Sequence, residues 1–191
     1  MAKAVLISIR PEWVEKIARG EKTVEVRKTR PKLETPFKCY VYRTKGVVKH
    51  IAKGEWFDMP VGGTVIGEFT CDRITPLFNV CTDNWHHLAG DVHEWHKELV
   101  KRACLTDAEL EAYAKGQNCF AWHISDLKIY DAPKDLTEFW LPPELYCEKE
   151  RCGGCPYDQV ADVNGEYSFD CEWKRPLTRP PQSWCYVEEL K

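Results

Sequence analysis

The feature that most constrains the fold is a series of short segments in which apolar and polar residues alternate, with segments of helical spacing between them. Alternation predicts β-strands, and apolar residues spaced three and four apart predict amphipathic helices. The expected strands are Ala4–Arg10, Lys22–Thr29, Lys38–Thr44, Thr64–Ile74, Cys119–Tyr130 and Ser183–Glu189. This order predicts a mixed β/α fold in which a small curved sheet or open barrel is flanked by helices.

Local signals place the helices and one irregularity. Pro11 suits the first position of a helix that Gly20 ends, and a second helix is expected at about His86–Cys104. Thr106-Asp107-Ala108-Glu109 is a capping box that opens a third helix, and Gly62-Gly63 indicates a turn. The apolar residues change side within the 119–130 strand, which predicts a bulge at Ser125-Asp126.

The overall charge excludes a uniformly basic nucleic-acid-binding surface. The 191 residues carry a net charge of −3, with 43% hydrophobic and 30% charged residues, as in folded globular proteins. A nucleic-acid contact therefore requires a local patch in an acidic body. No apolar run approaches the roughly 18 residues of a membrane span, and the N-terminus lacks the apolar core of a signal peptide. We expect a cytoplasmic protein without a membrane partner.

Four of the ten cysteines form a cluster with short spacings: Cys147, Cys152, Cys155 and Cys171. Thiolates in a Cys-x2-Cys turn hold zinc tetrahedrally, and Gly153-Gly154 suits that turn. The cluster predicts a structural zinc site, with a redox-active Cys152/Cys155 pair or unliganded thiols as alternatives. Cys185 can replace one of the four ligands. We expect residues 1–140 to form the main domain, and residues 141–191 a zinc-binding appendage whose final strand packs back on the barrel.

Several motifs resemble the ASCH domain, a member of the PUA-like superfamily. They are Leu6-Ile7-Ser8-Ile9-Arg10-Pro11, Ile17 to Arg27 with its Gly20-Glu21-Lys22-Thr23 core, Tyr40 to Lys45, Val65 to Phe69, and Ala121 to Tyr130. Together they extend over about residues 4–136. The segment from Cys147 to Val187 resembles a longer form of the family found in phages and gut bacteria.

The resemblance implies a PUA-like pseudobarrel of mostly antiparallel strands, with a cleft near Gly20–Arg27 that binds RNA or a modified nucleotide. Some relatives hydrolyse acylated pyrimidine nucleosides with the motif lysine, a threonine three residues later and a glutamate. Lys22 matches the lysine, but Glu25 stands at the threonine position. Other relatives are ribonucleases.

The residues themselves are consistent with a polar cleft. Thr23, Glu25 and Arg27 share one face of their strand, and Arg10 lies on a neighbouring strand. A lysine beside a glutamate is oriented for contact with a phosphate or carbonyl group, although Glu25 and Arg27 can equally be a solvated ion pair.

Four residues from other segments complete the candidate ligand site. Tyr42 and Lys45 offer base stacking and phosphate contact, although a tyrosine here can equally be core. Ser125 lies at the expected bulge, which can aim its hydroxyl into the cleft. His123 shares its face, with a buried, hydrogen-bonded histidine as the alternative.

The motifs and candidate residues are consistent with three functions. The first is binding of RNA or a modified nucleotide in a cleft around Lys22, Glu25, Arg27, Tyr42 and Lys45. The second is an enzyme in the same cleft, either a nucleoside amidohydrolase or a metal-independent ribonuclease. Its catalytic groups would be an amine from Lys22 or Lys45, a hydroxyl from Tyr42 or Ser125, and a carboxylate from Glu25 or Glu68. The third is a protein-interaction module that docks through Trp173 and Trp184.

Overall fold

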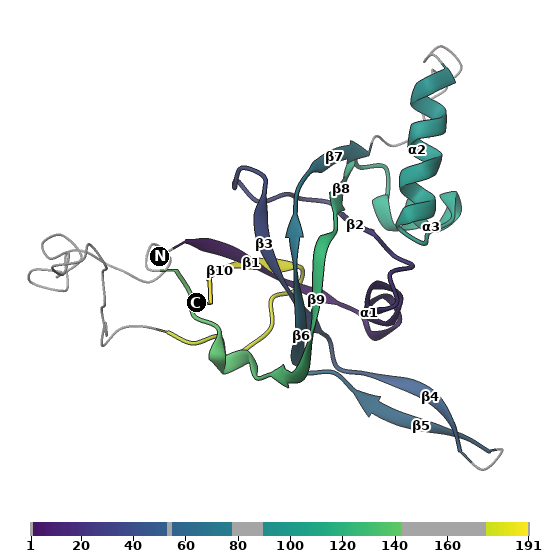
Figure 1. The fold of residues 1–191 in the computed structure, drawn as a ribbon. Coiled ribbons are helices and arrows are strands. Elements are labelled where there is room, and N and C mark those ends of the chain that lie inside the picture. The colour runs from purple at the N-terminus through teal and green to yellow at the C-terminus, as the bar shows by residue number, and fades with distance from the viewer. Residues whose placement is uncertain (1, 53–54, 78–89, 143–174, 191) are drawn as a thin grey trace, which may run out of the picture.

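The computed structural model of the chain describes residues 2–52, 55–77, 90–142 and 175–190 (Figure 1). Its elements are β1 (Lys3–Ile9), α1 (Pro11–Ala18), β2 (Val24–Arg27), β3 (Phe37–Arg43), β4 (Gly46–Ala52), β5 (Glu55–Val61), β6 (Thr64–Cys71), β7 (Ile74–Leu77), α2 (Gly90–Arg102), α3 (Asp107–Ala114), β8 (Cys119–His123), β9 (Ser125–Lys134), a 3-10 turn (Leu136–Glu138) and β10 (Trp184–Glu188).

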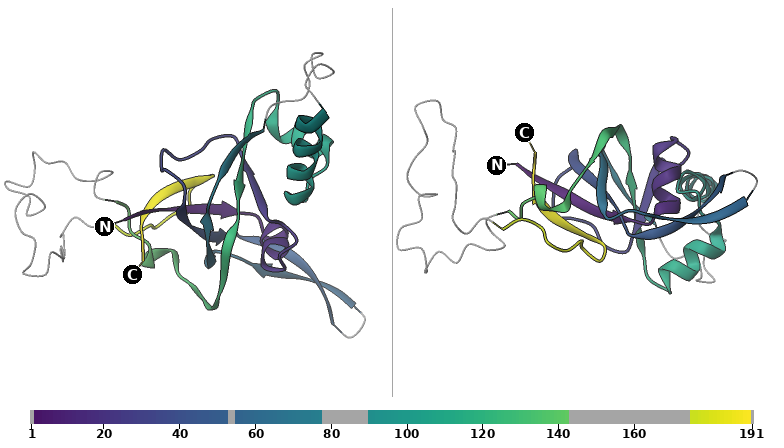
Figure 2. Two further views of the ribbon diagram at one scale, coloured as in Figure 1. Left: turned by 45° about the horizontal axis from the view of Figure 1, so that its top comes forward. Right: turned by 90° about the horizontal axis from the view of Figure 1, so that it is seen from below.

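The described strands form three sheets. The largest has the order β10-β1-β3-β6-β9, and all of its neighbours are antiparallel except β1 and β3. A second sheet has the order β2-β8-β7, and β4 pairs with β5 alone. The β4–β5 ribbon extends away from the rest of the molecule, while α2 and α3 lie together beside the β7–β8 end (Figures 1 and 2). The expected mixed fold of mostly antiparallel strands is confirmed.

Two continuous stretches of chain pass from the large sheet to the small one. The stretch 64–77 supplies β6 to the first and β7 to the second, and the stretch 119–134 supplies β8 and then β9. The sequence predicted one strand in each stretch, which is wrong because both are interrupted. The second breaks at Ile124. The expected bulge at Ser125-Asp126 is confirmed, because the β6–β9 register shifts between the pairs Glu68↔Lys128 and Thr70↔Ser125, and Asp126 has a positive φ of 48°.

The β4–β5 hairpin lies in a segment where the sequence predicted no strands. The predicted turn at Gly62-Gly63 is confirmed, and it leads from β5 into β6. Both glycines have positive φ, and a side chain at Gly62 would collide with the backbone of Thr44.

The core consists of three apolar clusters. One lies between the large sheet, α1 and Trp122, and a second lies between the small sheet, α2 and α3. A third covers the other face of the large sheet and includes Leu6, Tyr40, Tyr42 and Phe139. Because β1 contributes to the first and third clusters, residues 4 to 9 are all buried, and β1 is an interior strand of the large sheet, between β10 and β3.

The C-terminal strand completes the large sheet. β10 pairs with β1 along the register Lys3↔Glu188 to Ile7↔Trp184. The predicted zinc ligands Cys147, Cys152, Cys155 and Cys171 lie outside the described residues. Cys185 packs against the third cluster, and burial raises the pKa of its thiol to about 11. Among the described residues, no three metal-ligating side chains are grouped and no helix is long and apolar enough to span a membrane.

Candidate functional site

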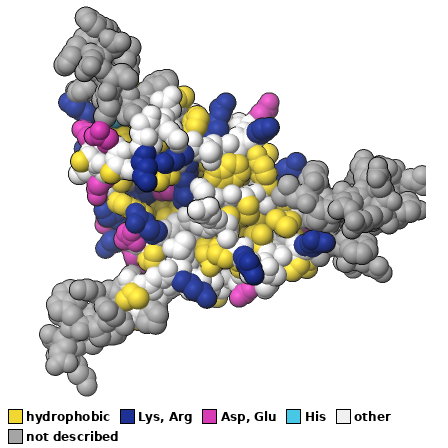
Figure 3. Space-filling view, turned by 180° about the vertical axis from the view of Figure 1, so that it is seen from behind, with side chains coloured by type: hydrophobic (Ala, Val, Ile, Leu, Met, Phe, Trp, Pro, Cys, Tyr) yellow, Lys and Arg dark blue, Asp and Glu magenta, His cyan; other side chains and the backbone are white. Residues whose placement is uncertain are grey.

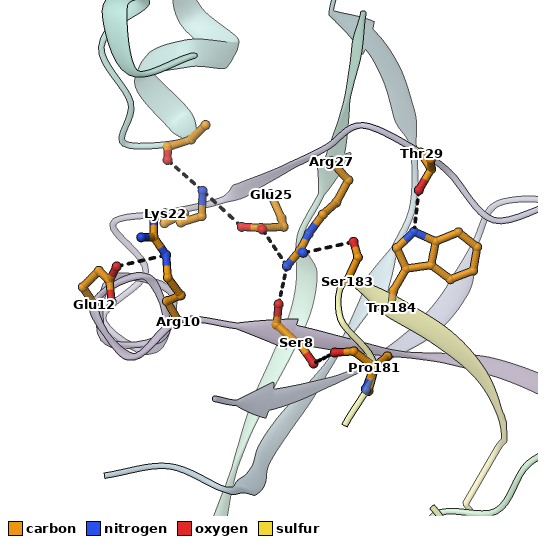
Figure 4. A network of polar contacts seen from close by, with 11 residues as sticks. Ser8, Arg10, Glu12, Lys22, Glu25, Arg27, Thr29, Pro181, Ser183 and Trp184 are labelled. Carbon is orange, nitrogen blue, oxygen red and sulfur yellow. Dashed lines mark hydrogen bonds and ion pairs between the residues drawn. The ribbon is translucent and has the colours of Figure 1, made fainter. Parts of the chain in front are cut away.

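A buried ion network lies along β2 and the residues before it. The Lys22 side chain is 3% exposed, and its Nζ donates to the carbonyl oxygen of Ala103 at 2.7 Å and contacts Glu25 Oε2 at 3.2 Å. Arg27 Nη2 contacts the other Glu25 oxygen at 3.0 Å. One carboxylate therefore lies between two cations, and we call Lys22, Glu25 and Arg27 the β2 charge network (Figure 4).

Arg27 extends this network to two other parts of the chain. Its Nη2 donates to the carbonyl oxygen of Ser8 on β1 at 2.6 Å, and its Nη1 donates to Ser183 Oγ at 3.3 Å. Ser8 Oγ in turn donates to the carbonyl oxygen of Pro181 at 2.7 Å. β2 is therefore joined through polar contacts to β1 and to the segment that leads into β10 (Figure 4).

Strand alternation explains why these charges point the same way. Val24 and Val26 face the apolar cluster under α2 and α3, so Glu25 and Arg27 must project to the opposite face. Lys22 is positioned by the tight end of α1, where Gly20 has a φ of 73° and the backbone N–H of Lys22 donates to Lys16.

A cavity of about 500 Å³ opens beside the network, which is within the usual size range of small-molecule sites. Apolar walls come from α1, α3 and the strands, and the polar lining includes the whole β2 charge network. We call it the β2 cavity; it is lined by Ser8, Ile9, Arg10, Trp13, Lys22, Glu25, Val26, Arg27, Thr44, Leu105, Glu109, Ala112, Tyr113 and Gln182.

Two aromatic rings line this cavity. Trp13 on α1 has the Lys22 ammonium 5.2 Å from its ring centroid, and Tyr113 on α3 has the Lys28 ammonium at 5.4 Å. Burial is the main cause of the raised pKa of Tyr113, so its phenol stays protonated and can donate. The cavity thus combines aromatic surface, a carboxylate acceptor and a cationic rim.

The family comparison is decisive for the fold. A family model of the ASCH domain matches residues 7–134, about two thirds of the chain. The chain belongs to the ASCH domain family. ASCH domains have a PUA-like fold and are generally RNA-binding domains.

Solved structures have a similar fold. The crystal structure of ASCH from Zymomonas mobilis has 18% sequence identity and a TM-score of 0.55, covering 97% of this chain and 88% of that one. A tyrosine-to-phenylalanine variant of the Zymomonas mobilis protein has 19% identity and a TM-score of 0.54, covering 98% and 92%. No curated protein sequence matches the chain.

The structure brings together four of the residues singled out in the sequence, since Arg10, Lys22, Glu25 and Arg27 all line the β2 cavity of this ASCH domain. Thr23 does not line it, and its hydroxyl accepts from Arg102 Nε at 3.0 Å.

Lys45 is exposed and follows Thr44, which is a cavity-lining residue, but does not line the cavity itself.

Four further candidates lie away from the β2 cavity. Tyr42 is 3% exposed and belongs to the third apolar cluster, so neither face of its ring is open for stacking. Ser125 Oγ donates to the carbonyl oxygen of Thr70, and Glu68 accepts from the Tyr130 hydroxyl.

His123 is held between two neighbours in the ASCH core. Its Nδ1 lies 3.3 Å from Arg73 and its Nε2 lies 2.9 Å from Thr75 Oγ1. Because a guanidinium only donates, Nδ1 must accept and Nε2 carries the proton. Burial, followed by the charges of Arg73 and Arg102, lowers the pKa of His123 to about 4. The imidazole is therefore neutral near pH 7, as in the buried, hydrogen-bonded alternative.

Several cavity residues could not be predicted from the sequence. Trp13 on α1 and Tyr113 on α3 lie on helices for which the sequence carried no functional signal. Gln182 comes from the C-terminal segment, far beyond the matched residues 7–134. The basic run from Arg27 to Lys32, which follows Glu25 in the sequence, is a pattern typical of nucleic-acid-binding patches. It is a sequence signal for this site that the predictions above did not use.

Proposed function

We propose that this ASCH domain binds RNA or a modified nucleotide by accommodating one unpaired nucleotide in the β2 cavity. The observation that supports this most is the β2 charge network on the lining of a cavity with aromatic walls. Recognition of single-stranded RNA commonly combines stacking on aromatic side chains with hydrogen bonds to base edges. Trp13 and Tyr113 provide the first, and Glu25 and Gln182 provide the second.

The cavity suits a base better than a phosphate. The cationic groups of Lys22 and Arg27 are already engaged with Glu25 and with backbone carbonyl oxygens. A carboxylate offers about four acceptor sites, so Glu25 can accept further hydrogen bonds from the amino or imino groups of a base. Arg10 lines the cavity and is exposed, and its ion pair among the described residues is with Glu12, which is also more than half exposed, so Arg10 is available to a phosphate.

A cavity-filling variant tests this function without disturbing the network. Ala112 is an exposed residue of α3 that lines the cavity, so Ala112→Phe places a ring in it. We expect the affinity for short single-stranded RNA, measured by fluorescence anisotropy, to fall at least about tenfold, which is about 1.4 kcal/mol. Ala108→Phe is the matched control, because Ala108 is exposed on the same helix and does not line the cavity. Equal affinities of both variants and the wild type would contradict the proposal.

An enzyme in the same cavity is the second candidate, favoured by the 3.2 Å contact between Lys22 and Glu25. The threonine of the amidohydrolase pattern is Glu25 here, and the hydroxyl of Ser8 donates to the carbonyl oxygen of Pro181, so neither of these two positions offers a free hydroxyl as a nucleophile. Incubation with acetylated cytidine and with mixed RNA tests the reaction. Formation of cytidine or of RNA fragments that Ala112→Phe abolishes would establish catalysis.

A further inference from the structure

A dense basic run continues the chain directly from the β2 charge network. Four of the six residues from Arg27 to Lys32 are basic, and none is acidic, in a chain whose net charge is −3. Arg30 and Lys32 are exposed, and Lys28 is half-buried. No acidic partner for Lys28, Arg30 or Lys32 is found among the described ion pairs. This is the local basic patch that an acidic body requires for contact with nucleic acid.

The C-terminal strand holds this segment in place. Trp184 Nε1 donates to Thr29 Oγ1 at 3.0 Å, and the backbone N–H of Lys32 donates to the Tyr186 hydroxyl at 2.7 Å. Pro31 is buried between the two exposed cations. These contacts fix the backbone of residues 29 to 32, so the cations are presented from an ordered segment and lose less freedom when a ligand binds.

The segment is continuous with the β2 cavity. Lys28 lies over the ring of Tyr113, which lines that cavity. Arg30 lies 5.8 Å from the ring centroid of Phe120, the residue opposite Arg27 in the β2–β8 register. Directly opposed residues of antiparallel strands project to the same face, so Phe120 and Arg27 share a face. Figure 3 shows Lys and Arg side chains spread over the face seen from behind, several of them on the helical side of the molecule.

A second hollow lies farther along the same segment. It has a volume of about 490 Å³, and its polar lining consists of Arg30, Lys32 and Thr35 together with one carboxylate, Glu34. Along the chain, the β2 cavity is therefore followed by Lys28 and Arg30, which lie over aromatic rings, and then by the second hollow. Single-stranded nucleic-acid sites combine a basic groove for the backbone with aromatic rings in this way.

We propose that the 28–32 segment is a backbone-binding track for single-stranded RNA, taking the phosphates next to the nucleotide held in the β2 cavity. The inference rests on the proposed function, and it specifies the ligand as an oligonucleotide instead of a free nucleotide. Lys28 and Arg30 contact the nearer phosphates, and Lys32 contacts one beyond them. The track is indifferent to base identity, because it reads charge alone.

The test compares RNA lengths in a charge-reduced variant. Arg30→Gln with Lys32→Gln removes two exposed cations while leaving the cavity lining intact. Lys128→Gln with Lys134→Gln is the control, since it removes the same charge from β9. Affinities for a dinucleotide and an eight-nucleotide RNA are measured by fluorescence anisotropy at several salt concentrations.

The wild type is expected to bind the eight-nucleotide RNA more tightly than the dinucleotide. The track variant should lose about tenfold for the longer RNA, with a salt slope smaller by about 1.4, and it should lose less for the dinucleotide, whose single phosphate still has Lys28 as a partner. An equal loss of affinity for the longer RNA in the control variant would contradict the track proposal, and so would equal affinities of the wild type for the two RNAs. Neither result would contradict the proposal that the β2 cavity binds a nucleotide. Dinucleotide binding that Ala112→Phe does not weaken would overturn the cavity instead. Displacement of the longer RNA by poly-glutamate of equal charge at equal concentration would assign the track to acidic proteins and overturn the RNA assignment.

Discussion

At the scale of single residues, the site depends on one carboxylate shared by two buried cations. Glu25 satisfies Lys22 and Arg27 at once, so the lysine of the motif is held in place by its surroundings and is not a free amine. The sequence predicted that these three residues lie together, because strand alternation and the motif both indicate it. It did not predict the burial of the network, which depends on Ala103, Ser8 and Ser183 from distant parts of the chain.

Glu25→Gln should destabilise the fold by about 3–5 kcal/mol, because it leaves two buried cations without their counter-charge. The measurement is the free energy of unfolding from urea titration. Glu12→Gln is the matched control, since the Arg10–Glu12 pair is more than half exposed and should change stability by less than about 1 kcal/mol. Similar small losses in both variants would show that the network is solvated.

His123 should make stability depend on pH below neutrality. Its pKa is about 4 in the fold and 6.5 in the unfolded reference, so between these values the unfolded chain binds more protons. Stability should therefore fall by a few kcal/mol as the pH drops from about 6.5 to about 4, and this contribution should not change below that. Urea unfolding of the wild type and of His123→Gln checks this. An equally steep loss in the variant would assign the effect to other groups.

At the scale of elements, the cavity depends on how α3 is started and held. The predicted capping box is confirmed, with Thr106 Oγ1 accepting from the Glu109 N–H and Glu109 accepting from the Thr106 N–H. Local rules of this kind are readable in the sequence because both partners lie within four residues. The sequence did not show that the chain leaves one sheet for the other between β6 and β7 and between β8 and β9. These crossings depend on pairing between distant segments, such as the hydrogen bond from the backbone N–H of His123 to the carbonyl oxygen of Arg73.

Thr106→Ala should cost about 0.5–2 kcal/mol of stability through the lost cap. Because Glu109, Ala112 and Tyr113 of this helix line the β2 cavity, RNA affinity should fall with it. Thermal unfolding and anisotropy titration measure the two effects. Asp107→Ala, which removes only a charge from the first turn, should have a smaller effect on stability, of about 0.3–1 kcal/mol. A stability loss in Thr106→Ala without any loss of affinity would show that α3 does not shape the binding site.

At the scale of the whole molecule, the C-terminal segment belongs to the site and to the sheet. Residues 175–190 lie beyond the matched region 7–134, yet they add β10 beside β1, place Gln182 at the cavity and hold the 28–32 segment. The sequence indicated a last strand there. Nothing in its local pattern indicated that Trp184 and Tyr186 pack against residues 29 to 32.

The cysteine cluster should hold about one structural zinc ion per chain. Thiolates at Cys-x2-Cys spacing bind the ion tightly enough to survive purification without chelator. Elemental analysis of the wild type and of Cys152→Ser with Cys155→Ser measures it, and the double variant should lose the metal. Cys104→Ser is the control, because Cys104 is remote in sequence from the cluster. Far less than one zinc in the wild type would reject the prediction.

The most direct test of RNA binding at the β2 cavity is to map where RNA touches the protein. An eight-nucleotide RNA carrying 4-thiouridine is irradiated with the wild type, and the crosslinked peptides are identified by mass spectrometry. We expect crosslinks at Trp13 or Tyr113 on the cavity walls, and their loss in Ala112→Phe. Crosslinks confined to other surfaces, such as the β9 edge around Lys128, would contradict the assignment of this cavity.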